Sequence, residues 1–486
     1  MPDGLKSRTL HGLFWSFFDR TGQQGIQFII SIILARLLAP EEFGLVAMLA
    51  VFMAIAQAFV GGGFGAALIH KADTGHVDEC SVFYFNILVG FLAAGVLCLA
   101  APGIAAFYKR PILVPLTRAL SLNLIINSFG IIQSTLLTKR LDFKAQMKIS
   151  LMAAFFSGLI GVSMAYRGYG VWSLVAQSLS STFLQTLLLW VFFPWRPVWA
   201  FSVASLRGMF PFGSKLLCAS VIATLFDNMY QLVIGKVFSA ADLGFYQRAK
   251  GFQQLPVDNI TSSVWRVTFP VFSSVKDDKA RLKRGVRKAL TTMAMVNFPL
   301  MIGLAIVAKP LVHVLLTDKW APCVPYLQLL CMAGLLYPLH AININVLTSQ
   351  GRTDLNLRIA ILKDFLRVAL LAVTFRFGIA AIIYGQIAQS VLCYFVNTYY
   401  TAVLIRYSVW EQILDLSPYL GTAGVMGVGV CALQYVITGN AALLLAAQVG
   451  TGLLLFTALC CLFRPQPFVE LWQMLRQKLR QLRYGA

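Results

Sequence analysis

Long hydrophobic segments follow one another along almost the whole chain. Fourteen of them have about the 20 mainly apolar residues that a transmembrane helix needs. They fall at residues 12–37, 43–68, 81–107, 113–137, 147–166, 170–193, 209–236, 243–273, 287–308, 324–349, 356–376, 378–404, 414–437 and 441–463. The connections between them are short. This pattern predicts an all-α polytopic membrane protein with about 14 transmembrane helices.

The composition supports this prediction and disfavours a soluble protein or a protein with a catalytic domain. Hydrophobic residues make up 58% of the chain and charged residues 12%, where a soluble domain carries about 25% charged residues. No small-residue cleavage site follows the first hydrophobic segment, so we interpret it as a retained helix. The nine cysteines and five histidines lack metal-ligand spacing. We therefore expect no metal, no cofactor and no catalytic domain, and a protein that is not an enzyme.

The basic residues are unevenly distributed between the connections. The formal net charge is +21. If the amino terminus is cytoplasmic and connections alternate sides, 24 of the 40 Lys and Arg residues lie on the cytoplasmic side and eight on the opposite side. This bias follows the positive-inside rule and places both termini in the cytoplasm. The charge therefore sets membrane topology, and we expect no nucleic-acid partner.

An internal repeat divides the chain. Residues 31–46 read SIILARLLAPEEFGLV and residues 231–246 read QLVIGKVFSAADLGFY, with apolar, cationic, acidic and glycine positions in register. Two weaker matches keep the same order, at 140–143 with 352–355 and at 169–171 with 377–379. The repeat predicts two parallel six-helix bundles, residues 1–203 and 204–406. Parallel repeats place the substrate site between bundles that are related by an axis along the membrane normal.

The remainder of the chain has no counterpart in the repeat. Residues 407–465 contain two additional, almost wholly apolar spans. Residues 466–486 alternate large apolar residues with Arg and Lys, which is typical of an amphipathic helix on the cytoplasmic membrane surface.

Ionisable residues inside the spans are concentrated in a few helices. An ionised side chain at the bilayer centre costs roughly 2.5–3.5 kcal/mol even on lenient scales. The candidate anion-binding residues are cationic, and the candidate ion-coupling residues are carboxylates. They are Arg20, Lys215, Arg248, Lys250 and Arg266 for substrate, and Asp19, Asp227 and Asp258 for ion coupling. All eight fall in the first, seventh and eighth spans, which predicts a wet, cationic cavity that receives an anionic substrate.

Several of these residues have a second interpretation. Lys215 lies near the cytoplasmic end of its span, where it could extend to the membrane surface. Arg266 also lies toward the cytoplasmic end of its span, so it could face the cavity or extend to the membrane surface. Pro256 stands between the charges of the eighth span, and a proline inside a helix usually bends it, so which cations face the cavity stays open. Gly61, Gly62 and Gly63 fit either close helix packing or a bending point.

Motifs along nearly the whole chain resemble a known family. They are Gly12-Leu13-Phe14-Trp15, residues 34–44 (LARLLAPEEFG), residues 133–143 (QSTLLTKRLDF), residues 168–172 (GYGVW) and residues 243–249 (LGFYQRA). Together they are similar to the Wzx-like polysaccharide exporters of the multidrug/oligosaccharidyl-lipid/polysaccharide (MOP) superfamily, in the colanic-acid and lipopolysaccharide-biosynthesis branch.

The resemblance implies a MATE-like fold whose two six-helix bundles rock around a central cationic cavity. The implied substrate is an undecaprenyl-pyrophosphate-linked oligosaccharide, moved across the bacterial inner membrane toward a polysaccharide polymerase. Coupling to a proton or sodium gradient is also implied. Two alternatives remain: a multidrug exporter of the same fold, and a membrane polymerase or ligase of lipid-linked glycans. The excess of cations over acids within the spans disfavours the first, and the short outward connections disfavour the second.

Overall fold

The computed structural model of the chain describes residues 3–71, 74–437, 439–470, 472–473 and 476. Within these residues the regular structure is entirely helical. Ten segments are long and apolar enough to cross a membrane, and the bent pair α5–α6 raises this number to as many as 11 in the described part of the chain. The chain is thus a multi-pass membrane protein, as predicted.

The predicted spans correspond to single helices or to pairs of helices in sequence. The first ten helices are α1 (Asp3–Leu37), α2 (Pro40–Gly61), α3 (Phe64–His70), α4 (His76–Tyr108), α5 (Leu113–Ser128), α6 (Ile131–Lys139), α7 (Phe143–Tyr166), α8 (Val171–Phe192), α9 (Val203–Asp227) and α10 (Met229–Val237). The others are α11 (Ala240–Ser274), α12 (Lys279–Leu316), α13 (Cys323–Gly334), α14 (Tyr337–Ser349), α15 (Thr353–Thr374), α16 (Ile379–Ile405), α17 (Val409–Val436) and α18 (Ala441–Phe463). Short 3-10 turns, Asp318–Trp320 and Phe375–Phe377, precede α13 and α16.

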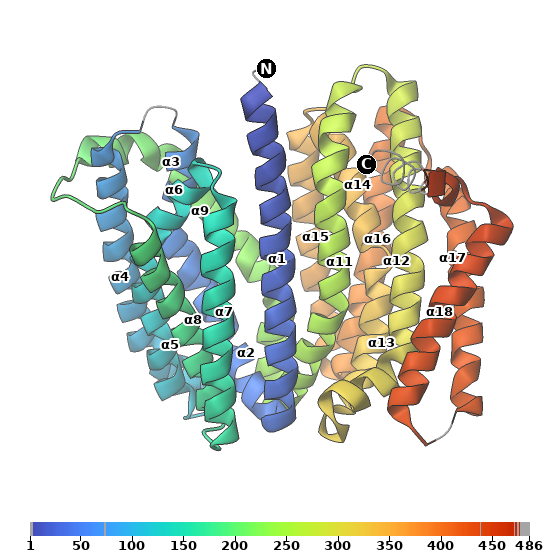
Figure 1. Ribbon diagram of the computed structural model, residues 1–486, viewed down its shortest axis with the longest axis horizontal. Helices are drawn as coiled ribbons and strands as arrows, with labels where there is room; N and C mark the ends of the chain where they lie inside the picture. The colour runs from blue at the N-terminus through green and yellow to red at the C-terminus, as the bar shows by residue number, and fades with distance from the viewer. Residues whose placement is uncertain (1–2, 72–73, 438, 471, 474–475, 477–486) are drawn as a thin grey trace, which may run out of the picture. The chain divides into compact units, whose positions relative to one another are not determined.

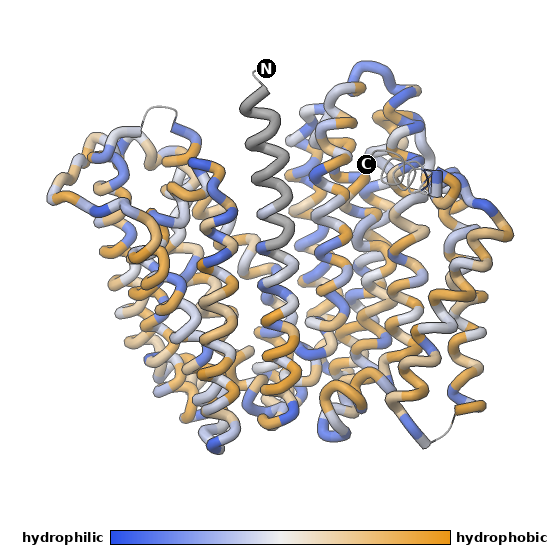
Figure 2. Tube along the Cα trace, in the orientation of Figure 1, coloured by the Kyte–Doolittle hydropathy of each residue, from blue (hydrophilic) through white to orange (hydrophobic). Residues whose placement is uncertain are grey.

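Three predicted spans are not among the apolar segments. They form α1, α11 and α15. Ionisable residues lower the mean hydropathy of these helices. They include Asp19 and Arg20 of α1, Arg248 and Lys250 of α11, and Lys363, Asp364 and Arg367 of α15. Elsewhere the middle sections of the helices are mainly hydrophobic, and hydrophilic positions gather at many helix ends (Figure 2).

The helices form two compact units, residues 1–244 and 245–486. In unit 1, α7 packs between α1 and α8, and α4 packs along α5 (Figure 1). The helices α9 and α10 pack on α2 and α4 in the same unit. The predicted bundle boundary at 203/204 follows the sequence repeat, whereas these contacts place α9 and α10 with the helices before them. The division into two repeated bundles stays a prediction.

In unit 2, α12 is the central packing element. It contacts α13, α17 and α18, while α16 packs on α13, α14 and α15. The core includes Leu282 and Leu290 of α12, Leu339 and Val346 of α14, and Tyr407. The additional spans α17 and α18 form an antiparallel pair beside α12 (Figure 1). Residues 466–470 are helical, and most of the predicted amphipathic helix lies outside the described residues.

Local sequence explains where helices break and where they continue. Between α2 and α3, Gly62 and Gly63 have φ of 49° and 68°, a conformation that glycine adopts without strain. By contrast, α11 continues through Pro256. Arg248 and Arg266 of this continuous helix are five turns of about 3.6 residues apart, which places them on the same face.

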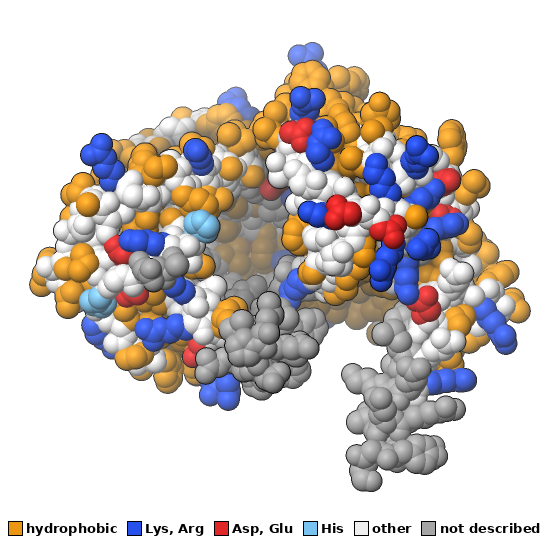
Figure 3. Space-filling view, turned by 90° about the horizontal axis from the view of Figure 1, so that it is seen from above, with side chains coloured by type: hydrophobic (Ala, Val, Ile, Leu, Met, Phe, Trp, Pro, Cys, Tyr) orange, Lys and Arg blue, Asp and Glu red, His pale blue; other side chains and the backbone are white. Residues whose placement is uncertain are grey.

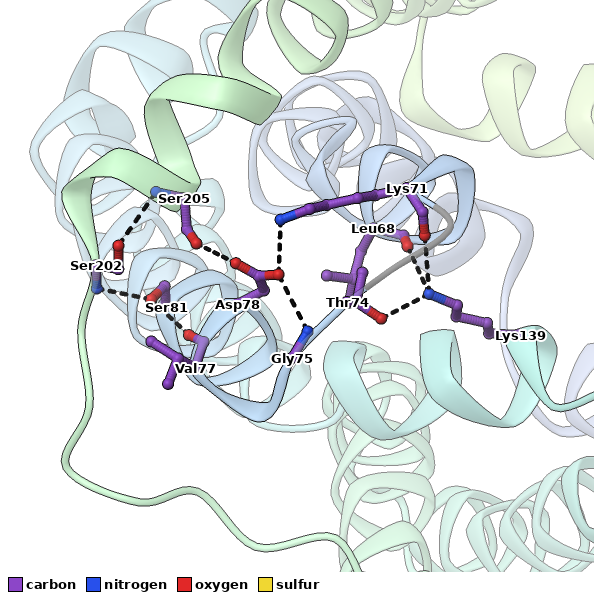
Figure 4. Close-up of polar contacts among 10 residues, drawn as sticks. All are labelled: Leu68, Lys71, Thr74, Gly75, Val77, Asp78, Ser81, Lys139, Ser202 and Ser205. Atoms are coloured by element: carbon purple, nitrogen blue, oxygen red, sulfur yellow. Dashed lines mark hydrogen bonds and ion pairs between the residues drawn. The ribbon is translucent and has the colours of Figure 1, made fainter.

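The start of α4 is held by a carboxylate that binds three donors. One oxygen of Asp78 accepts hydrogen bonds from Lys71 Nζ at 2.7 Å and from the Gly75 N–H at 3.2 Å. The other oxygen accepts a hydrogen bond from the Ser205 hydroxyl (Figure 4). Because Ser205 lies in the first turn of α9, this carboxylate joins the starts of two helices that are distant in sequence.

Further hydrogen bonds extend this junction. The Ser202 N–H donates to Ser81 Oγ at 2.8 Å. Lys139 Nζ, from the end of α6, donates to Thr74 Oγ1 at 2.7 Å and to the carbonyls of Leu68 and Lys71 (Figure 4). The junction fixes the first turn of α9, the helix that carries the candidate residues Lys215 and Asp227.

The junction predicts a pH-dependent stability. Burial raises the pKa of the Asp78 carboxyl, but its hydrogen bonds and the charge of Lys71 outweigh this effect, and the pKa lies below its ordinary value. A carboxyl with a lowered folded-state pKa stabilises the protein above its unfolded pKa of about 3.9, and this stabilisation is lost as the pH falls through the folded-state value. We expect Asp78→Asn to lower the melting temperature of the detergent-purified protein at pH 7, and the deficit to shrink toward pH 3.

The control is Asp277→Asn, which removes an exposed carboxyl and should leave the melting temperature unchanged. A deficit for Asp78→Asn that is equally large at pH 7 and pH 3 would contradict a stabilising role of the ionised carboxylate.

Candidate functional site

The candidate residues of α1 lie against α7. Asp19 is half-buried and hydrogen-bonded to Ser150 of α7. Lys144 Nζ, at the start of α7, lies 5.4 Å from the centre of the Trp15 ring. The side chain of Arg20 lies outside the described part of the chain. The structure thus gives Asp19 a defined place in the contact between α1 and α7.

The candidate residues of α9 are both exposed on the surface of unit 1. Lys215 lies within α9, and Asp227 is its last residue. Directly after it, Asn228 Nδ2 donates to the carbonyl of Thr224 at 2.8 Å and separates α9 from α10. The carboxylate of Asp227 therefore stands at a break in the span, where the backbone departs from a continuous helix.

The four ionisable residues of α11 differ in environment. Arg248, Lys250 and Asp258 are half-buried, and Arg266 is exposed. The Arg248 guanidinium lies 5.3 Å from the centre of the Trp320 ring, and the Trp320 side chain is completely buried. A guanidinium over an indole face is stabilised by cation–π attraction, so Arg248 has a packing role in unit 2 beside any role in binding.

The predicted cationic site draws on α1, α9 and α11. Within unit 1 the structure places Asp19, Lys215 and Asp227, and within unit 2 it places the residues of α11. That these residues line one cavity stays a prediction.

Unit 2 contains a buried polar network that the sequence interpretation missed. His340 and Asn343 of α14, Asn397 and Thr401 of α16 and Gln412 of α17 form it. Thr401 Oγ1 donates to Asn343 Oδ1 at 3.0 Å, and the Gln412 amide bonds the same oxygen at 3.5 Å. Asn397 Nδ2 lies 3.0 Å from His340 Nδ1. The signal was present as polar residues three or four apart on apolar helices, which share a face.

The hydrogen bonds define the state of the buried imidazole. With the amide nitrogen of Asn397 facing His340 Nδ1, this ring nitrogen is the acceptor of the hydrogen bond. His340 Nε2 lies 3.2 Å from Ser390 Oγ, and this hydroxyl donates to the carbonyl of Ala333. The pattern fits a neutral imidazole protonated at Nε2. Hydrogen bonds between buried polar side chains favour one arrangement of their helices, so the network joins α14 to α16 and α17.

Basic residues at the start of α12 form ion pairs within unit 2. Lys283 Nζ lies 2.8 Å from a Glu411 carboxylate oxygen, and Arg287 pairs with Asp415. A hydrogen bond from Lys283 holds the pKa of Glu411 below its usual range. Figure 3 shows Lys and Arg side chains beside Asp and Glu side chains on this face of unit 2. These cations therefore join the starts of α12 and α17, in addition to the topological role predicted for them.

A metal centre is not evident in the described part of the chain. No group of three or more His, Cys, Asp or Glu side chains there is arranged to hold a metal ion.

Comparisons with known proteins agree with the fold. The lipid II flippase MurJ, in an inward closed conformation, aligns with a TM-score of 0.75 at 12% identity over 93% of this chain and 98% of that chain. An inward-facing multidrug-resistance MATE transporter of the MOP superfamily aligns with a TM-score of 0.63 at 14% identity, over 81% of this chain and 100% of that chain. At these identities the likeness shows the fold alone, and it confirms the predicted MATE-like fold.

Sequence relatives show the family. The model of a family described as polysaccharide biosynthesis protein matches residues 33–325. The teichuronic acid biosynthesis protein TuaB of Bacillus subtilis is 30% identical over 84% of this chain and 85% of its own length. The lipopolysaccharide biosynthesis protein WzxC of Escherichia coli is 26% identical over 81% of both chains. The predicted resemblance is thereby confirmed: the chain belongs to the polysaccharide biosynthesis protein family of Wzx-like exporters.

Proposed function

We propose that the chain is a flippase for a polyprenyl-pyrophosphate-linked oligosaccharide in the bacterial inner membrane, with both termini in the cytoplasm. The observation that carries the proposal is the concentration of cations in α11, a helix of a multi-pass family member whose other spans are mostly apolar. Charged residues inside a membrane protein line substrate or ion pathways as a rule. The family and the fold support the same conclusion.

The chemistry of such a substrate fits these residues. A pyrophosphate is bound best by Lys and Arg, whose charge-assisted hydrogen bonds are about twice as strong as neutral ones. Arg248 and Lys250 lie two residues apart in α11 and therefore on nearly opposite faces of the helix, whereas Arg266 shares a face with Arg248. The polyprenyl tail is apolar and can remain in the bilayer. A substrate of this class therefore needs a polar, cationic route only for its head.

Two other functions fit the observations less well. A multidrug exporter of cationic drugs needs acidic residues, whereas α11 holds three cations and one carboxylate among its in-span candidates, namely Arg248, Lys250, Arg266 and Asp258. A membrane polymerase or ligase needs a sizeable outward loop for its acceptor. The connections between the described helices on the predicted outer side are only a few residues long.

Transport against a gradient needs coupling to an ion, and three carboxylates are candidates. Asp19, Asp227 and Asp258 are the ones proposed, with H⁺ or Na⁺ as the ion. Asp227 is favoured because it is exposed and ends α9 at a break in the span. Broken helices at such positions supply ion sites in other transporters.

Reversing the two cations of α11 tests the binding role. We expect Arg248→Glu with Lys250→Glu to abolish surface polysaccharide in cells that depend on this chain, while membrane insertion and abundance are preserved. The physical reason is that two added carboxylates would repel a pyrophosphate. The measurement is polymer content per unit of membrane-inserted protein.

Two further variants separate charge from packing. Arg248→Lys keeps the charge but loses the planar contact with Trp320, and it should retain most of the export. Arg167→Glu, in the exposed connection between α7 and α8, is the matched reversal outside the site and should be neutral. Normal polymer output from the double reversal would remove these residues from the binding site.

Neutralising Asp227 tests the coupling role. We expect Asp227→Asn to weaken transport that is driven by an imposed proton or sodium gradient in reconstituted vesicles. An uncharged amide can neither take up and release a proton nor balance the charge of a sodium ion. The matched control is Asp277→Asn, in an exposed connection. Gradient dependence equal to that of the unchanged protein would exclude Asp227 as the coupling carboxylate.

A further inference from the structure

Four exposed cations stand at the end of the α11–α12 hairpin, on the side of the membrane that the charge bias predicts to be cytoplasmic. They are Lys276, Lys279, Arg281 and Arg284, and we name them the basic hairpin end. None of their side chains forms an ion pair with a described residue. Figure 1 shows that this connection extends beyond the other helix ends of unit 2 on its side. These cations are therefore open to their surroundings.

The other cations at the start of α12 are used within unit 2. Lys283 and Arg287 form the ion pairs with α17, and Lys288 pairs with Glu470 of the short helix after α18. Lys and Arg side chains gather on this face of unit 2 (Figure 3). The basic hairpin end therefore lies beside cations that join helices, but it does not take part in those ion pairs.

The sequence repeat provides an internal comparison for this connection. In the first repeat the corresponding residues, 68–80, contain one Lys, no Arg and three carboxylates, and the lysine, Lys71, pairs with Asp78. Residues 274–286 contain five Lys and Arg and two Asp. The first repeat turns on the same predicted side without an excess of cations. The requirements of membrane topology therefore do not explain the excess in the second repeat.

The basic hairpin end lies at the level of the lipid head groups. The apolar part of α12 begins at Ala289. A helix rises 1.5 Å per residue, which places Arg284 and Lys279 about 7 and 15 Å before that point. The head-group layer of one leaflet is about 5–7 Å thick, and the Debye length at physiological ionic strength is about 8 Å. The cations thus lie within electrostatic reach of the lipid phosphates.

An exposed tryptophan marks the same level. Trp410, in the first turn of α17, is 73% exposed, and tryptophan is enriched at the interface between membrane and water. The next residue, Glu411, pairs with Lys283. Because Lys283 stands between Arg281 and Arg284 in the chain, the basic hairpin end lies at about the depth of this interface.

The connection holds its backbone in place while its cations stay open. The Arg281 N–H donates to Asp278 Oδ1 at 2.9 Å and caps α12. Gln350 Nε2 donates to the carbonyl of Lys276 at 2.8 Å. Arg281 and Arg284 are three residues apart in α12 and therefore share a face. A guanidinium binds a phosphate through two parallel hydrogen bonds, so two of them on one face suit a single phosphate group.

We propose that the basic hairpin end binds the phosphates of anionic phospholipids in the cytoplasmic leaflet. Clusters of Lys and Arg directly cytoplasmic of a transmembrane helix recognise such lipids, and each cation near the surface raises the affinity about fivefold. The depth of the cations favours a lipid over an acidic protein as the partner. Phospholipid binding is independent of the substrate that the chain transports, so it goes beyond the proposed function.

Native mass spectrometry of the detergent-purified full chain tests the proposal. The protein is titrated with phosphatidylglycerol and, separately, with zwitterionic phosphatidylethanolamine. We expect the unchanged protein to prefer phosphatidylglycerol at least tenfold, and K276Q/K279Q/R281Q/R284Q to lose this preference. A preference that is retained in this variant would overturn the proposal.

A variant with the same loss of charge is the control. K148Q/R167Q/R207Q/R464Q removes four exposed cations that lie outside the hairpin, and it should keep the preference for phosphatidylglycerol. An equal loss in both variants would show that net charge alone attracts the lipid, and would overturn the assignment to the basic hairpin end.

Two further measurements examine the nature of the contact. R281K/R284K keeps the charge but removes the paired hydrogen bonds, so its preference should fall between those of the unchanged protein and the four-residue variant. Raising the ionic strength to 1 M shortens the Debye length to about 3 Å and should reduce the preference of the unchanged protein. A preference that is insensitive to salt would contradict an electrostatic contact with phosphate.

The melting temperature in lipid nanodiscs gives a readout that includes folding. A ligand that binds only the folded protein stabilises it, so adding phosphatidylglycerol to neutral nanodiscs should raise the melting temperature of the unchanged protein and of the control variant. It should not raise that of K276Q/K279Q/R281Q/R284Q, which should melt like the unchanged protein in neutral nanodiscs. A lower melting temperature there would show that these cations stabilise the fold itself, and would overturn the proposal.

An acidic protein partner would give a different result. If the four-residue variant keeps its lipid preference but loses a protein that is retained by the unchanged chain, the basic hairpin end is a protein-docking surface. That outcome would also overturn the assignment to phospholipid.

Discussion

A bilayer offers no hydrogen-bond partners to the groups that it surrounds, and this constraint shapes every part of the chain. Backbone groups must bond within their own segment, so the spans are helices. Polar side chains must either find partners or line a wet space. In unit 2, Asn343, Thr401 and Gln412 satisfy one another. An ionised side chain costs roughly 2.5–3.5 kcal/mol at the bilayer centre, and the function that we propose, transport of an anionic head group, gives a reason for the charges of α11.

The fold was predictable from the sequence where hydrophobic segments were long enough to span a membrane and recurred along the chain. Hydrophobic length predicted the order of the spans, and the ionisable residues of the first and eighth spans distinguished α1 and α11 from the apolar helices. The positions of the helix breaks were harder to predict from the sequence. Gly62 and Gly63 were recognised as unusual, but the choice between packing and bending needed the positive φ values and the close approach of Gly213. The break at Asn228 had no strong signal, because asparagine occurs both within helices and at their ends.

The candidate site was predictable in composition but not in detail. The residue types of α11 indicated an anion site, whereas the contact between Arg248 and Trp320 joins residues far apart in sequence. The network around His340 was missed because isolated polar residues on apolar helices were each interpreted alone. The sequence repeat, by contrast, aligns two glycines whose proximity in space the alignment alone did not predict. Its matched glycines, Gly44 and Gly244, meet in space, and that meeting depends on the backbone path and not on residue type.

The most direct test of the central claim is mass analysis of lipid extracts from cells in which this chain has been deleted. If the chain moves a polyprenyl-pyrophosphate-linked oligosaccharide, the polymer should disappear, and a complete oligosaccharide unit on its lipid carrier should accumulate. The mass of that intermediate would also identify the sugar unit. Loss of polymer without any lipid-linked intermediate, or polymer output equal to that of the parent cells, would contradict the account.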